Sequence, residues 1–367
     1  MRFKSNAFRD LRGHGVGVRT CIMAAAGFAG SLMLTSIGAL AQGAPQLESA
    51  VKIESASPDW DYLSFDEKRG RLFIAARPDG LLVYDVRSQK LLERLGDTKG
   101  ANASVPVPEV DRLYSVNLDG TVTIFELSSL KQVGKIKVGE DADAAFYDPV
   151  TKQIAVTRGD SSEITYLSAP SGEVVARLKL PSKKLEGTVA DGRGHMFTAS
   201  RDRNSVFKVD MRTHQLVAEY ADVCEEANGA AIDTVRGRLF IGCRGKNPAL
   251  AVVDIQTGGV VAKMEIGRGN DGVIYDAQTG RIYASGGVDG NLVVHQQIDA
   301  NNYQLAAAVT TRPYARTMAF DPGSQKIYLV TAEGNADPKK KINKSAAPFY
   351  PNTYFANTFT VLTYTQQ

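Results

Sequence analysis

A strand-like segment returns seven times along this chain at an almost constant spacing. Each copy starts with a basic or polar residue, followed by an aliphatic residue, often an aromatic one, and then β-branched or small residues. The aliphatic residues stand at positions 72, 113, 154, 196, 239, 282 and 327, so the steps are 41, 41, 42, 43, 43 and 45 residues. A period in the low forties with several short strands per repeat is typical of β-propellers. We therefore predict an all-β fold, a seven-bladed β-propeller with four-stranded antiparallel blades.

The last repeat contains too few strands to form a blade alone. It supplies three strand-like segments, at 317–321, 326–331 and 358–363. The segment 47–54, directly before the first inner strand, matches an outer strand in length and pattern. We expect this N-terminal strand to complete the last blade and close the ring, so that residues 42–367 form one domain. The last repeat also carries one long insertion, 333–356, which predicts either a solvated flap or a lid over one end of the channel.

Residues 1–41 have the composition of a secretory signal peptide. Five basic residues lie within the first 19 positions, residues 22–40 are uncharged and mostly apolar, and Ala39-Leu40-Ala41 forms an A-x-A cleavage site. This pattern predicts a Sec-type signal peptide cleaved after Ala41, and thus a periplasmic or secreted protein. The alternative is an uncleaved membrane anchor, because the apolar stretch is long enough to cross a bilayer.

The predicted signal peptide also accounts for the basic character of the chain. The chain has 43 basic and 40 acidic residues, and residues 1–41 hold five of the former and one of the latter. The remaining 38 basic and 39 acidic residues leave a net charge of −1. A globally basic surface for nucleic acid is therefore not supported.

Two cysteines, Cys224 and Cys243, remain after the predicted signal peptide. In an oxidising compartment an isolated pair of cysteines often forms a disulfide. The repeat places both residues on the same face of neighbouring blades, so we expect them to be bonded. The alternative is two buried free thiols.

A polar residue recurs five positions before the end of each inner strand. These residues are Asp61, Asn102, Asp143, Glu186, Asn228, Asp271 and Arg316. Because the inner strands of a propeller run side by side around its axis, we expect these side chains to form one ring at the mouth of the central channel. Arginines at the ends of second strands are expected on the same face: Arg77, Arg158, Arg201 and Arg244.

An acidic ring beside arginines suits a polar or zwitterionic ligand, because arginine binds carboxylates and phosphates through paired hydrogen bonds. The alternative is structural. Residues near strand starts are often polar because they meet water and cap backbone groups. In a repeat protein, the same structural requirement recurs in each of the seven blades and would produce seven polar residues.

Short motifs within the repeats resemble those of the YVTN-repeat β-propellers, a WD40-like family of secreted bacterial proteins. The matching residues are Asp148-Pro149, Asp321-Pro322, Tyr114-Ser115-Val116-Asn117, Leu250-Ala251-Val252-Val253-Asp254 and Thr257-Gly258. The resemblance covers nearly all of the chain after residue 41. It implies a propeller in the periplasm or at the cell surface, without a common reaction. Blade two departs from the pattern, since Val107-Pro108-Glu109 replaces the Asp-Pro turn.

No catalytic signature is visible, because the chain has no Gly-x-Ser-x-Gly elbow, no Walker loop and no Cys-x-x-Cys-His. Our leading hypothesis is a monomeric, non-enzymatic propeller without a cofactor, which binds a small polar ligand or a periplasmic protein partner at the channel face. A second hypothesis is a lactonase-like, metal-assisted hydrolase. Its divalent cation, for example calcium, would be held by Asp143, Glu186, Asn228 and Asp271. A third is a nucleic-acid-binding propeller, which needs a continuous arginine patch.

Overall fold

The computed structural model describes residues 43–335, 337, 339 and 353–366. These residues belong to a compact unit that spans residues 42–367. The predicted signal peptide lies outside the described residues, and so does much of the predicted insertion. Among the described residues, no helix is long and apolar enough to cross a membrane.

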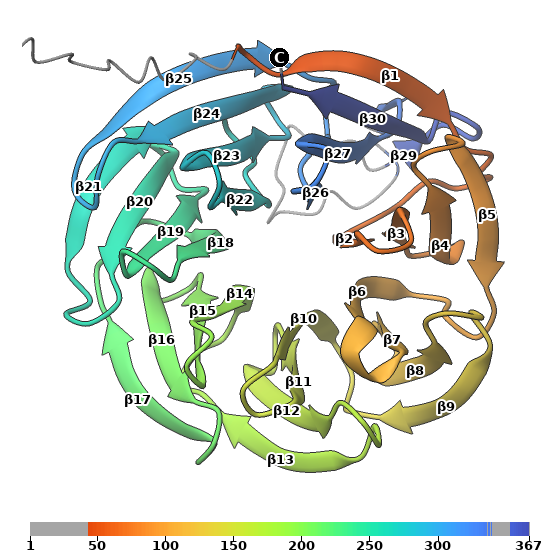
Figure 1. Cartoon of the computed structure of the whole chain (residues 1–367), viewed down its shortest axis with the longest axis horizontal. Helices are drawn as coiled ribbons and strands as arrows, with labels where there is room; N and C mark the ends of the chain where they lie inside the picture. Colours follow the sequence, from red (N-terminus) through yellow and green to blue (C-terminus); the bar gives the residue numbers. More distant parts are fainter. Residues whose placement is uncertain (1–42, 336, 338, 340–352, 367) are drawn as a thin grey trace, which may run out of the picture. The chain divides into compact units, whose positions relative to one another are not determined.

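Seven four-stranded antiparallel sheets surround one axis, as the repeat predicts (Figure 1). Each of the first six blades uses four consecutive strands, which run from the axis outward. The first three blades are β2 Leu63–Asp66, β3 Arg71–Ala76, β4 Gly80–Asp85 and β5 Lys90–Leu95; β6 Ala101–Val107, β7 Arg112–Asn117, β8 Thr121–Glu126 and β9 Gln132–Lys137; and β10 Ala142–Asp148, β11 Gln153–Arg158, β12 Glu163–Ser168 and β13 Val174–Lys179. The next three are β14 Leu185–Ala190, β15 His195–Ser200, β16 Ser205–Asp210 and β17 Gln215–Tyr220; β18 Ala227–Asp233, β19 Arg238–Cys243, β20 Ala249–Asp254 and β21 Val260–Glu265; and β22 Val273–Asp276, β23 Arg281–Gly286, β24 Asn291–Gln297 and β25 Tyr303–Thr310.

The seventh blade joins the two ends of the propeller. Its strands, from the axis outward, are β26 Met318–Asp321, β27 Lys326–Thr331, β30 Thr360–Thr365 and β1 Gln46–Lys52. Antiparallel pairing from Gln46↔Thr365 to Lys52↔Thr360 makes β1 the outer strand, which confirms the expected closure. The closing strand ends at Lys52, two residues before the expected end at 54. Ile53, the next residue, is buried, and its backbone N–H donates to the carbonyl of Phe359 at 2.7 Å.

The hydrophobic core consists of seven clusters, one at each interface between neighbouring blades. Strand β3 shows how one strand serves two of them. Leu72 and Ile74 pack toward blade seven, whereas Phe73 and Ala75 pack toward blade two. A strand that is buried on both faces needs a continuous apolar run, and this run is the segment that repeats in the sequence.

Blade two contains the one short helix of the described residues. A 3-10 helix, Pro108–Val110, fills the turn between β6 and β7, where the Asp-Pro motif is absent. Proline suits the start of such a turn because its φ is already close to the helical value.

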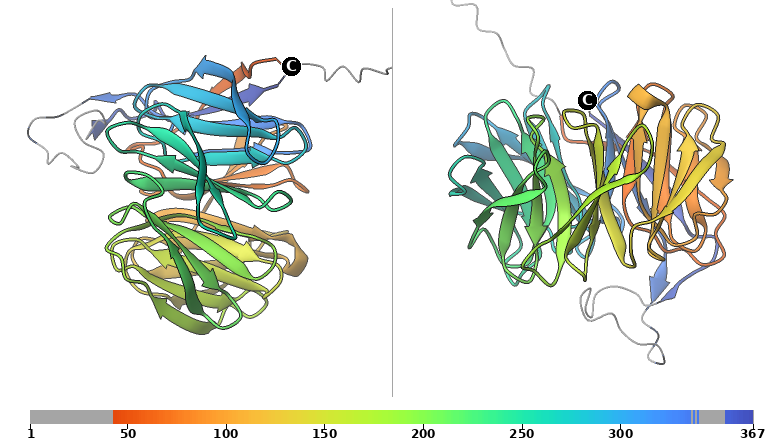
Figure 2. Two further views of the ribbon diagram at one scale, coloured as in Figure 1. Left: turned by 90° about the vertical axis from the view of Figure 1, so that its left-hand side faces the viewer. Right: turned by 90° about the horizontal axis from the view of Figure 1, so that it is seen from below.

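The polar ring positions, the ends of the second strands and the strands at the base of the insertion all lie on one face of the propeller. We call it the ring face, defined by the starts of the inner strands. This follows from antiparallel pairing, in which the start of one strand lies beside the end of the next. The described part of the insertion forms a small ribbon on this face, in which β28 Gly334–Asn335 pairs with β29 Thr353–Tyr354. Figure 2 shows these two short strands standing away from the blades.

Candidate functional site

The structure brings the seven ring positions together around the axis. Six of them are at most 9% exposed, and hydrogen bonds join neighbours from different blades. The Nδ2 of Asn102 donates to Oδ1 of Asp143 at 2.5 Å, and the Nδ2 of Asn228 donates to Oδ1 of Asp271 at 2.6 Å. We call the seven residues and the cations that contact them the axial cluster.

Asp271 is the most fully paired carboxylate of the axial cluster. It accepts a hydrogen bond from the side chain of Asn228, and it forms ion pairs with Arg316 at 2.9 Å and Arg244 at 3.3 Å. Burial alone would raise the pKa of Asp271, but the charges of Arg244 and Arg316 outweigh burial and hold the pKa below its usual value. This carboxylate is therefore ionised and neutralised within the protein.

Arg77, the cation that pairs with Asp61, also contacts a residue of the neighbouring blade. The guanidinium of Arg77 donates to Asp61, and its Nε also donates to Oδ1 of Asn102 at 2.7 Å. A third contact joins Arg77 to Asp59 at 3.4 Å. Burial raises the pKa of Asp61, and the charges of Arg77 and Arg316 limit the rise.

Asp143 and Glu186, in blades three and four, are less well compensated. Lys184 lies 3.8 Å from Asp143 and is closer to Asp160, at 3.0 Å. Arg201 lies 3.4 Å from Glu186 and is closer to Glu226, at 3.1 Å. In both cases the cation has its shorter contact with a carboxylate outside the ring.

The pKa values of these two carboxyl groups follow from that geometry. Burial raises the pKa of Asp143 well above its usual range, and the charge of Glu186 adds to the effect. Burial also raises the pKa of Glu186 to about 7, with a further contribution from Asp271. The axial cluster thus has one side where carboxylates are neutralised and one where they compete for protons or for another cation.

Lys184 belongs to the axial cluster and Tyr62 lies beside it, although the repeat pattern identified neither residue. Burial raises the pKa of Tyr62 well above its usual value, and the charges of Asp143 and Glu186 add to the rise. The signal in the sequence is proximity, since Tyr62 follows Asp61 and Lys184 stands two positions before Glu186.

The second-strand arginines do not act as one group. Arg77, Arg201 and Arg244 contact carboxylates of the axial cluster. Arg158 instead donates to Glu163 on the next strand at 2.7 Å and to the carbonyl of Glu140 at 2.9 Å. The structure therefore separates Arg158 from the other three, and each of the four is paired with an acidic side chain.

Trp60 links the axial cluster to the insertion. It is fully buried, and its ring lies 5.1 Å from the guanidinium carbon of Arg316. Its other ring contacts are Tyr354 of β29, at 4.9 Å, and Phe359, at 5.4 Å. A cation over a tryptophan ring is an attractive arrangement, so Trp60 also helps to orient Arg316.

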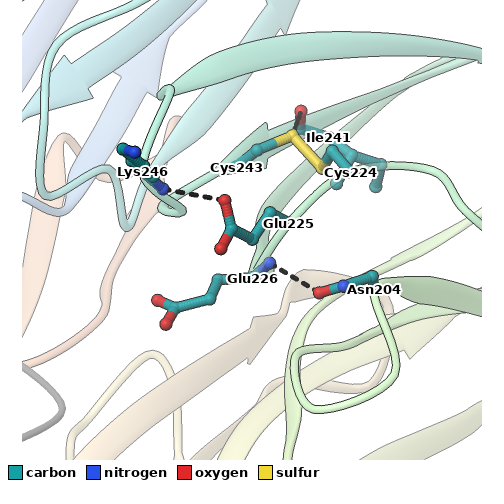
Figure 3. The surroundings of a disulfide bond; sticks show 7 residues. All are labelled: Asn204, Cys224, Glu225, Glu226, Ile241, Cys243 and Lys246. Atoms are coloured by element: carbon teal, nitrogen blue, oxygen red, sulfur yellow. Dashed lines mark hydrogen bonds between the residues drawn. A yellow bond between two sulfur atoms is a disulfide. The ribbon is translucent and has the colours of Figure 1, made fainter.

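The two cysteines form a disulfide (Figure 3), and Cys243 directly precedes Arg244 of the axial cluster in the sequence. The bond ties the connection between blades four and five to the end of β19, with the two Cα atoms 6.0 Å apart. Glu226, the partner of Arg201, follows two residues later, and its backbone N–H donates to Asn204 at 2.8 Å. The disulfide thus restrains the loop that carries Glu226.

The metal hypothesis names Asp143, Glu186, Asn228 and Asp271. Asn228 turns its donor nitrogen toward Asp271, and Asp271 faces two arginines. Among the described residues, no group of three or more His, Cys, Asp or Glu side chains is arranged to hold a metal ion. The oxygens of Asp143 and Glu186 remain the best donors that this set offers.

The fold is similar to solved β-propellers at low sequence identity. The WD40 repeats of RRP9 match with a TM-score of 0.72 and 12% identity, over 89% of this chain and 100% of that chain. A chain of Kuenenia stuttgartiensis hydrazine synthase matches with a TM-score of 0.64 and 14% identity, over 76% and 94%. A chain of the mitotic checkpoint complex matches with a TM-score of 0.67 and 13% identity, over 77% of this chain and 90% of that chain. No family model and no curated protein matches the sequence significantly. These similarities establish a β-propeller with WD40-like structural neighbours.

Proposed function

We propose that this protein is a secreted or periplasmic binding propeller, related to the YVTN-repeat family, that engages a charged ligand or protein partner at the ring face. WD40-like propellers commonly serve as interaction scaffolds, which supports a binding role for this fold. The observation that carries the proposal is the uneven compensation of charge in the axial cluster.

The argument rests on the cost of burying ions. A buried carboxylate is costly unless cations and hydrogen bonds compensate it. Asp271 has such compensation, whereas Asp143 and Glu186 share their cations with outside carboxylates at shorter distances. An incoming positive group, such as an amine or a guanidinium, would complete the pairing of Asp143 and Glu186. We therefore expect a ligand or partner segment that carries a positive charge.

A thermal-shift screen tests this expectation. The purified protein is melted with a panel of amines, including putrescine and arginine, and with inorganic anions, sugars, lactones and divalent cations. A ligand at 100 times its Kd stabilises a protein by roughly 2.7 kcal/mol, which gives a measurable shift in Tm. We expect a shift with amines that is lost in an Asp143→Asn/Glu186→Gln variant.

Glu140→Gln is the matched control, because Glu140 is an exposed carboxylate near the same face. It should keep the full shift. A shift with calcium alone that the double variant loses would favour the metal-assisted hydrolase instead. No shift with any compound, or a shift that the double variant keeps, would contradict a binding role for these two carboxylates.

A further inference from the structure

A pocket lies on the ring face, and none of its lining residues is a carboxylate of the axial cluster. It sits where the connection from blade six meets blade seven and the base of the insertion, and it has a volume of about 270 Å³. Its walls include Pro313, Tyr314, Ala332 and Phe355. Pockets for drug-sized molecules span roughly 300–1,000 Å³, so this one suits a smaller compound.

The interior of the pocket is apolar, although three threonines line it. The hydroxyl of Thr331 donates to the carbonyl of Pro313, and that of Thr360 donates to the carbonyl of Thr358. The hydroxyl of Thr358 donates to the carbonyl of Phe355 and accepts the backbone N–H of Glu333. Since these hydroxyls are already engaged, a ligand meets mainly methyl groups and aromatic rings.

Tyr314 is held in an unusual conformation at this pocket. Its φ is 70°, in the left-handed region that bulky residues rarely adopt. Its backbone N–H donates to the carbonyl of Gly287 at 2.6 Å, and its ring meets Tyr354 edge-on at 5.9 Å. Strained residues of this kind persist where the surroundings hold them and are concentrated at ligand sites. Phe355, across the pocket, is 44% exposed, which is a large apolar surface for a described aromatic residue.

Two opposite charges stand at the rim. Arg312 and Glu333 line the pocket and are both exposed. Within the described part of the chain, neither side chain forms an ion pair within 4.0 Å. The pocket therefore combines an apolar interior with a guanidinium and a carboxylate at its mouth, which complement the two charges of an amino acid.

We propose that this pocket binds a free α-amino acid with an aromatic or branched apolar side chain. The side chain lies between Tyr314 and Phe355, the carboxylate meets Arg312 and the ammonium meets Glu333. This site is independent of the proposed function, since none of its residues contacts Asp143 or Glu186.

The structure also provides a reporter for the site. Tyr354 contacts both Tyr314 and Trp60, and Trp60 is the only tryptophan in the chain. A ligand that touches Tyr314 changes the packing around Trp60. We therefore expect the tryptophan fluorescence to change saturably on titration.

The test titrates the purified protein with L-phenylalanine and follows both fluorescence and heat. Two analogues remove one charge each: N-acetyl-L-phenylalanine keeps the carboxylate, and L-phenylalaninamide keeps the ammonium. Each lost charge should weaken binding by roughly tenfold or more, as for a charge-assisted hydrogen bond. Arg312→Ala should weaken binding of L-phenylalanine and of the N-acetyl compound but not of the amide. Glu333→Gln should weaken binding of L-phenylalanine and of the amide but not of the N-acetyl compound.

Both substitutions alter exposed side chains, so folding should be preserved, and a melting curve checks it. Asp143→Asn/Glu186→Gln is the control and should bind L-phenylalanine normally. The proposal is overturned by the absence of saturable binding, by equal binding of all three compounds, or by affinities that neither rim substitution changes.

Discussion

Replacing Glu186 with glutamine tests the charge arrangement of the axial cluster. Glu186 is 6% exposed, and burial raises its pKa from an ordinary value of 4.5 to about 7. The folded protein therefore binds a proton here at pH values where the unfolded chain has lost it. The free energy of unfolding must then fall as the pH rises from about 4.5 to 7.

The magnitude follows from the difference in pKa. One pKa unit corresponds to 1.36 kcal/mol, so a rise from 4.5 to about 7 amounts to about 3 kcal/mol between acidic and neutral pH. Glutamine has nearly the same shape as protonated glutamate but cannot ionise. Glu186→Gln should therefore match the wild type near pH 4.5 and exceed its stability by about 3 kcal/mol at pH 8. Relief of the repulsion on Asp143 acts in the same direction.

Urea unfolding of both proteins at half-unit steps from pH 4.5 to 8 measures this difference. Glu163→Gln is a control for which the stability difference from the wild type should have the opposite sign. Burial opposes ionisation of Glu163, but hydrogen bonds from Arg158 and Arg177 outweigh burial and lower its pKa. The wild type should then be more stable than Glu163→Gln above about pH 4.5 by a constant amount. Parallel curves for the wild type and Glu186→Gln across the whole range would refute the reasoning.

Three further predictions concern the frame around this site. Asp271→Asn should lower the free energy of unfolding by about 3–5 kcal/mol, because Arg244 and Arg316 lose a buried partner, and the urea midpoint measures it. Cys224→Ser/Cys243→Ser should lower the free energy of unfolding by about 3 kcal/mol, since the bond closes a loop between residues 19 positions apart. Adding reductant should lower the stability of the wild type by the same amount and leave that of the double variant unchanged. If the signal peptide is cleaved as predicted, the exported protein should begin at Gln42, which N-terminal sequencing checks; a start at Met1 would favour the membrane anchor.

The repeat predicted the strands well because the second strand of each blade is buried on both faces. All seven repeated segments begin at the first residue of an observed strand, from Arg71 in β3 to Lys326 in β27. The same register placed the seven ring positions together, since equivalent positions in a propeller are related by rotation about one axis. The ends of strands were predicted less accurately, as the end of β1 at Lys52 shows, because they depend on packing against other blades.

Side-chain partners could not be predicted from the repeat. Arg158 stands one position earlier in its blade than Arg201, because it pairs with Ala142 whereas Ser200 pairs with the equivalent Leu185. Successive side chains on a strand point to opposite faces, and Arg158 contacts Glu163 on the next strand. Lys184 stands outside the repeated position and contacts Asp143 only because the loop before the inner strand β14 brings it there. A pattern of positions predicts which backbone segments meet. The choice of partner depends on distances of a few ångströms, which the spacing does not contain.

The closing pair of strands has a consequence for how the chain folds. Because β1 comes from the start of the propeller and β30 from its end, the seventh blade cannot form until the last strand has been synthesised. Until then Trp60, Ile74 and Tyr84 of the first blade lack the covering side chains of Tyr328 and Phe359. Contacts so distant in sequence form late, and the unfinished chain exposes an apolar seam in the meantime. That seam is the surface that a chaperone, or a second unfinished chain, would meet first.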